Sequence, residues 1–145
     1  MESVPLKILL ADDDMDDCEF FKEALDDLTI HGNLTILHDG ILLMKYLNDN
    51  NNSLPDVLFL DINMPCKNGH ECLIEIKNSE RLKHIPVIII STSMEEEVVK
   101  MFYANGAHNY IRKPANFSQL KIIISDALLD IQQHKVQPAL EKVCD

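Results

Sequence analysis

Short, unbroken runs of apolar residues recur along the chain, and each is followed by apolar positions at helical spacing. The run at residues 6–11 precedes Phe21, Ala24 and Leu28, which are spaced i, i+3, i+7 on an amphipathic helix that begins near Met15. Strands that are apolar at every position are typical of parallel sheets covered by helices on both faces. The pattern therefore predicts a layered α/β fold.

The same alternation continues to the end of the apolar pattern. The predicted strands are residues 6–11, 34–37, 57–61, 87–90 and 107–111, and the predicted helices are residues 15–28, 41–47, 68–78, 94–105 and 116–132. Five strands alternating with five helices imply parallel strands joined by right-handed crossovers.

Polar residues mark where several of these helices begin. Asp14 is placed to cap the first helix, and Asp16 and Asp17 suit the positive end of its dipole. Asn68, followed three residues later by a glutamate, predicts a capping box. Ser93 precedes Glu96 at the same spacing, so Ser93 has two interpretations, a helix cap or a functional hydroxyl.

Length and charge limit the possible functions. The 145 residues predict one domain at 1–132 with a tail at 133–145 and no output domain. A net charge of −11 argues against binding to nucleic acid or an anionic membrane. No signal peptide or membrane-spanning run is evident, which predicts a cytoplasmic protein. The four cysteines lack metal-binding spacing, and reduced thiols are expected.

Acidic, hydroxyl and basic residues follow the predicted strands where each one ends. They are Asp12, Asp13, Asp61, Ser91 and Lys113. Because the carboxyl ends of parallel strands share one edge, these side chains are expected to converge. Three carboxylates within a few ångströms repel by about 3 kcal/mol per pair at an effective dielectric constant of about 20. Lys113 supplies one compensating charge, so a hard divalent cation, Mg²⁺, is the expected remainder.

A carboxylate beside Mg²⁺, a lysine and a hydroxyl can accept a phosphoryl group. The cation and the ammonium neutralise the phosphoryl oxygens while the carboxylate attacks in line. Asp61 is the expected nucleophile because it ends the central strand, and the adjacent Asp12 and Asp13 are better placed to hold the metal.

These motifs resemble the signature of response-regulator receiver domains of two-component signalling. The matching residues are Asp12-Asp13, the segment Asp61-Ile62-Asn63-Met64-Pro65 with Gly69, Ser91, and Lys113-Pro114. The resemblance spans about residues 6–132 and implies a flavodoxin-like sheet with strand order 2-1-3-4-5. A serine at position 91, where the family more often has threonine, preserves the hydroxyl.

The resemblance also implies a role for each site residue. Asp61 would be the phosphoacceptor, Asp13 a direct Mg²⁺ ligand, Asp12 a ligand through water, and Asn63 the donor of a backbone carbonyl. Ser91 and Lys113 would bind the phosphoryl group, and Tyr110 would turn inward on activation.

The implied partners are a sensor histidine kinase or phosphotransfer protein and a downstream protein target. The chain resembles stand-alone receivers, and its hydroxyl run at residues 91–93 and long final helix are similar to those of receivers paired with phytochrome-type kinases. Ile122 and Ile123 have two interpretations, contact with a homodimer partner through the fourth and fifth helices, or additional core.

Three other functions fit parts of the pattern. A haloacid-dehalogenase-type hydrolase needs an acid two residues after the nucleophile, where this chain has Asn63. A flavodoxin-like flavin binder needs a phosphate loop after the first strand, where this chain has six acids. A degenerate receiver used only for docking is disfavoured because every key position is filled.

Overall fold

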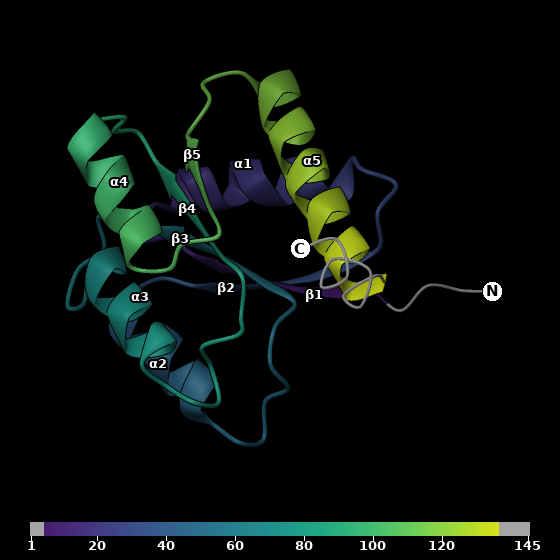
Figure 1. The fold of residues 1–145 in the computed structure, drawn as a ribbon. Coiled ribbons are helices and arrows are strands. Elements are labelled where there is room, and N and C mark those ends of the chain that lie inside the picture. The colour runs from purple at the N-terminus through teal and green to yellow at the C-terminus, as the bar shows by residue number, and fades with distance from the viewer. Residues whose placement is uncertain (1–4, 137–145) are drawn as a thin grey trace, which may run out of the picture.

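Five parallel strands form one sheet, in the order β2-β1-β3-β4-β5, in a computed structural model that describes residues 5–136 and, for 134–136, the backbone alone (Figure 1). The strands are β1 (Leu6–Ala11), β2 (Gly32–Leu37), β3 (Val57–Asp61), β4 (Val87–Ser91) and β5 (Asn109–Arg112). The helices are α1 (Met15–Asp26), α2 (Gly40–Asn48), α3 (Gly69–Lys77), α4 (Glu96–Ala104) and α5 (Phe117–Val136). The α/β class and the strand order expected from the sequence are confirmed.

The central strands are buried on both faces, as their unbroken apolar sequences predict. Every residue of β3 and of β4 is buried. Alternate residues of the sheet point to two separate cores: Leu58 and Leu60 pack in the core with α2, α3 and α4, whereas Val57 and Phe59 pack in the core with α1 and α5. Figure 1 shows the two groups of helices on opposite sides of the sheet. Among the described residues, no helix has the length and apolar character needed to cross a bilayer.

Strand register brings the carboxyl ends of the strands to one edge of the sheet. Ala11, the last residue of β1, pairs with Leu60, and Asp61 pairs with Ile90 on β4. Ser91, the last residue of β4, pairs with Arg112 on β5. The residues that directly follow or end four neighbouring strands are therefore held together by backbone pairing.

Helix caps fix the loops at this edge. Asp14 accepts hydrogen bonds from the backbone N–H groups of Asp16 and Asp17, as predicted. Asn68 and Glu71 form the predicted capping box at the start of α3.

Two boundaries differ from the sequence prediction. The prediction that Ser93 caps a helix is wrong: Glu95 occupies the N-cap of α4, and no side chain caps the helix. The Ser93 Oγ accepts a long hydrogen bond, 3.5 Å, from the Glu95 N–H. Tertiary placement of the loop after β4 overrides the local signal. Helix α5 continues to Val136, so residues 133–136 of the predicted tail are helical and the remainder lies outside the described residues.

Gly69 lets the first turn of α3 lie directly against the end of β3. A Cβ at this position would lie 2.5 Å from the Asp61 carbonyl oxygen and 2.9 Å from the Ile62 Cα, both backbone atoms that cannot turn aside. The Gly69 N–H donates to the Ile62 carbonyl oxygen at 2.9 Å. Glycine is therefore required here by close backbone approach.

We expect Gly69→Ala to lower the free energy of unfolding by about 1–3 kcal/mol, because the added methyl group must push backbone apart. Gly32→Ala is the matched control, since its Cβ would meet the flexible end of the Ile8 side chain at 2.6 Å. Urea denaturation of both variants measures the difference. Equal losses would show that the approach of backbone to Gly69 is not what constrains the position.

Candidate functional site

Three carboxylates from two loops meet at the carboxyl edge of the sheet. Asp12 follows β1 and is 2% exposed, Asp61 ends β3 and is 5% exposed, and the neighbouring Asp13 is exposed. One carboxylate oxygen from each lies within 4.8 Å of the others. The convergence predicted from the sequence is therefore present, with two of the three acids buried.

Burial makes this cluster electrostatically costly. Desolvation, and after it the charge of Asp12, raise the pKa of Asp61 to about 7, although Lys113 and a hydrogen bond from the Asn63 backbone act in the opposite direction. The cluster thus lacks enough positive charge to keep Asp61 fully ionised near neutral pH.

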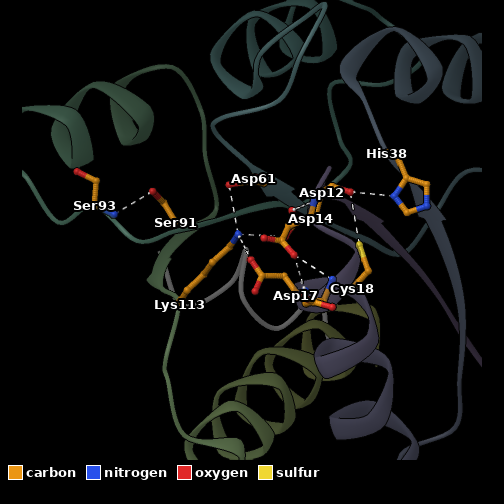
Figure 2. A network of polar contacts seen from close by, with 10 residues as sticks. Asp12, Asp14, Asp17, Cys18, His38, Asp61, Ser91, Ser93 and Lys113 are labelled. Atoms are coloured by element: carbon orange, nitrogen blue, oxygen red, sulfur yellow. Dashed lines mark hydrogen bonds and ion pairs between the residues drawn. The ribbon is translucent and has the colours of Figure 1, made fainter.

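Lys113 lies among the acids, on the loop after β5 (Figure 2). Its Nζ is 3.1 Å from Asp12 Oδ2, 2.9 Å from Asp17 Oδ2 and 3.6 Å from Asp61 Oδ1. Burial alone would lower the pKa of this lysine, but the hydrogen bond to Asp17 and the charges of Asp61 and Asp12 together raise it. Lys113 therefore stays an ammonium with three competing partners.

Asp17 was not predicted to belong to this group. Its position in the first turn of a helix was explained by the helix dipole, and that explanation is incomplete because its carboxylate makes the shortest contact to Lys113. The signal that could have found it is positional: α1 starts from the loop that carries Asp12 and Asp13, so its first turn faces the same edge.

Ser91 and Tyr110 are linked to each other through the backbone of Ser93. The Ser91 Oγ accepts a hydrogen bond of 3.1 Å from the Ser93 N–H, so its own proton is left to donate (Figure 2). Tyr110 is 7% exposed, and its hydroxyl donates to the Ser93 carbonyl oxygen at 2.8 Å. The ring is already inward here, and its turning on activation stays a prediction.

Cys18 and His38 both contact the backbone of the loop that carries Asp12 and Asp13. The Cys18 thiol donates to the Asp12 carbonyl oxygen at 3.4 Å, and His38 Nδ1 lies 3.2 Å from the same oxygen. Burial, and then nearby acids led by Asp12, raise the pKa of Cys18 to about 12, so this thiol stays protonated at neutral pH. Cys18, Cys66 and Cys72 are free, as predicted, and Cys144 lies outside the described residues.

The sequence model of the response regulator receiver domain family matches residues 8–125. The chain belongs to this family. The match includes every candidate site residue, most of β1 and all of β3, which confirms the resemblance found in the motifs.

Related receiver domains cover most of the chain. Response regulator Rcp1 of Synechocystis sp. is 38% identical over 124 residues, which are 82% of this chain and 84% of that protein. The probable methanogenesis regulatory protein FilR2 of Methanothrix harundinacea is 34% identical over 125 residues, 84% of this chain and 81% of that protein.

Solved structures agree with the fold and with the finer resemblance to phytochrome-associated receivers. The phosphorylated cyanobacterial phytochrome response regulator RcpA superposes with a TM-score of 0.79 at 36% identity, covering 94% of this chain and 97% of that one. The Mn²⁺-bound form of Rcp1 superposes with a TM-score of 0.76 at 33% identity, covering 92% and 94%.

The donor set of this receiver domain fits a divalent cation. The grouped side chains offer only carboxylate oxygens, which are the ligands that hard cations prefer. The raised pKa of Asp61 indicates that a further positive charge at the cluster would stabilise its ionised form. Asn63 lies in the loop after β3, and its backbone makes a hydrogen bond to the Asp61 carboxyl group.

The raised pKa makes stability depend on pH in the metal-free protein. The folded state binds the Asp61 proton more tightly than the unfolded chain, for which the pKa is about 3.8, so this stabilisation is complete below about pH 4 and is lost as pH rises through about 7. We expect about 2 kcal/mol more stability at pH 5.5 than at pH 8 from this group.

Urea denaturation in the presence of a chelator measures this pH dependence. Asp61→Asn cannot titrate, so its stability should change less between the two pH values than that of the native protein. Parallel pH profiles for the two proteins would contradict the raised pKa.

Proposed function

We propose that this receiver domain accepts a phosphoryl group on Asp61 from the phosphohistidine of a sensor histidine kinase or phosphotransfer protein. The observation that supports this most is the placement of one buried carboxylate within 4.8 Å of two other acids and 3.6 Å from a lysine ammonium. A buried acid in these surroundings is an activated group with its counter-charges already in position.

The proposed metal is Mg²⁺. It would be held by the carboxylates of Asp13 and Asp61, by Asp12 through water, and by the backbone carbonyl of Asn63. Bound there, it supplies positive charge to the phosphoryl oxygens as they approach Asp61. Carboxylate and carbonyl oxygens with no thiolate or imidazole in the group favour Mg²⁺ over zinc.

Asp61 is the nucleophile in the proposed transfer. One of its oxygens forms a bond to phosphorus while the phosphorus–nitrogen bond of the donor breaks, and the electron pair of that bond stays on the donor imidazole. Lys113 and Ser91 then bind phosphoryl oxygens, because an ammonium and a free hydroxyl proton are hydrogen-bond donors. Hydrolysis of the acyl phosphate by water returns the protein to its starting state.

The conformational signal would pass through the Ser91–Ser93–Tyr110 link. When the Ser91 hydroxyl turns toward the phosphoryl group, its bond from the Ser93 N–H is weakened and the loop before α4 is free to shift. That loop also carries the carbonyl oxygen that holds the Tyr110 hydroxyl. Helix α4 has no side-chain cap to resist the change.

The output face would be formed by α4, β5 and α5. Tyr103 on α4 is 45% exposed and Ile122 on α5 is 61% exposed, which are large apolar groups for a surface. This supports contact with a downstream protein or a second copy through these helices. Ile123 is only partly exposed and contributes less to such a face. The similarity to RcpA and Rcp1 supports a phytochrome-type kinase as the partner, with the exchange taking place in the cytoplasm.

Asp61→Asn should abolish phosphorylation, because an amide cannot form the acyl phosphate. The test is incubation with acetyl phosphate, with and without Mg²⁺, followed by intact-mass measurement and peptide mapping. The native protein should gain one phosphoryl group on Asp61 only when Mg²⁺ is present. Labelling of the variant to the native extent, or labelling indifferent to Mg²⁺, would contradict the proposal.

Ser91→Ala should weaken binding of the phosphoryl mimic beryllofluoride about tenfold, because a hydrogen bond to a charged group is lost. Ser91→Thr keeps the hydroxyl and serves as the matched control. Amide NMR titration reports both the affinity and the movement of the Ser93–Tyr110 link. If alanine and threonine behave alike, the hydroxyl has no role in the switch.

A further inference from the structure

The Lys113 ammonium has more carboxylate partners than the phosphoryl-binding role requires. Asp17 Oδ2 is the nearest, at 2.9 Å, Asp12 Oδ2 follows at 3.1 Å, and Asp61 Oδ1 is farthest at 3.6 Å (Figure 2). Only the first two contacts have hydrogen-bond geometry. The ammonium is thus drawn toward α1 and away from the proposed phosphoacceptor.

The backbone of Asp17 is fixed, and its side chain is partly exposed to water. Its N–H donates to the capping carboxylate of Asp14 at 3.1 Å, which fixes the first turn of α1. Its side chain is nevertheless 42% exposed, whereas that of Asp12 is 3% exposed. The Asp17 carboxylate can therefore turn into water at little cost in desolvation, and Asp12 cannot.

This difference matters when a phosphoryl group arrives on Asp61. Two of the three Lys113 N–H donors are already hydrogen-bonded, to Asp17 and to Asp12, so an ammonium that moves toward a phosphoryl group on Asp61 must lengthen one of these two bonds. An exchange with Asp12 would take the ammonium from a buried carboxylate whose Oδ2 water reaches poorly, although its Oδ1 keeps the hydrogen bond from the Asp14 N–H. An exchange with Asp17 leaves a carboxylate that water can solvate. Asp17 is consequently the partner that Lys113 can leave.

We propose that Asp17 is a positioning residue that holds Lys113 away from Asp61 in the unphosphorylated protein and releases it to the phosphoryl group. This inference rests on the proposed function of Asp61. The Asp17 carboxylate then has two effects. It keeps Asp61 available to a divalent cation, because Lys113 is not fully paired with Asp61. It also competes with the phosphoryl group for the Lys113 ammonium.

Asp17→Asn should therefore move two affinities in opposite directions. Without Asp17 the ammonium settles closer to Asp61, so Mn²⁺ should bind about fivefold more weakly in calorimetric titration. With Mg²⁺ saturating, beryllofluoride should bind about fivefold more tightly, because its competitor is gone. General damage to the fold would weaken both ligands, and urea denaturation would reveal it.

Two variants control for charge and for contact. Asp16→Asn removes the same charge one residue away, and Asp16 has an exposed side chain that forms no ion pair among residues 5–133. Its affinities should stay near those of the native protein. Asp17→Glu keeps a carboxylate within reach of Lys113 and should restore the native pattern.

The outcomes separate this inference from the proposed function. If the native protein forms a Mg²⁺-dependent adduct on Asp61 but Asp17→Asn behaves like Asp16→Asn, Asp17 does not position Lys113. If Asp17→Asn lowers or raises both affinities together, the exchange is also refuted. If the native protein forms no adduct on Asp61, the phosphoacceptor assignment itself is wrong, whatever the Asp17 variants show.

Discussion

Repulsion between buried carboxylates is the constraint around which this end of the molecule is built. Asp12 and Asp61 are almost inaccessible to solvent, and burial together with mutual repulsion raises the pKa of Asp61 to about 7. A structure that served stability alone would not place two acids there, because buried like charges are destabilising. Lys113 offsets part of the repulsion, and the remaining need for positive charge is what suits the site to the cation and the phosphoryl transfer proposed for it.

The fold holds this arrangement with backbone more than with side chains. Parallel pairing places the ends of β1, β3 and β4 at one edge, and the Lys113 N–H donates to the Ser91 carbonyl oxygen at 2.7 Å. Gly69 brings α3 against the Asp61 carbonyl oxygen. Since these contacts do not depend on the charged groups, the acids can change ionisation or partners without loss of the sheet.

The sequence predicted most of the fold because local pattern and global architecture agree in this chain. Apolar runs such as the one in β4 specify buried strands, and Asp14 and Asn68 start their helices where capping chemistry places them. The capping signal at Ser93 failed because the Ser91 hydroxyl and the Tyr110 hydroxyl both bond to the Ser93 backbone, which ties it to the loop after β4. The length of α5 was underestimated because a polar helical turn near its end resembles a loop in sequence.

The sequence predicted which residues gather at the site, but it did not predict which of them contact one another. Strand ends identified Asp12, Asp13, Asp61, Ser91 and Lys113, because topology alone brings them together. Asp17 was not predicted as a site residue, because its favourable position at the start of a helix dipole was a sufficient reason for an acid there and its ion pair with Lys113 was not considered. The uneven sharing of Lys113 among three acids depends on ångström-scale distances, which residue spacing does not encode.

Helix α4 buries a single side chain, Phe102, and begins without a side-chain cap. The free energy that separates its docked form from a locally unfolded one is therefore small compared with that of the whole domain. In the proposed switch, a signal at the sheet edge that displaces α4 would disturb one fully buried side chain, while the sheet and the other helices remain as a fixed frame.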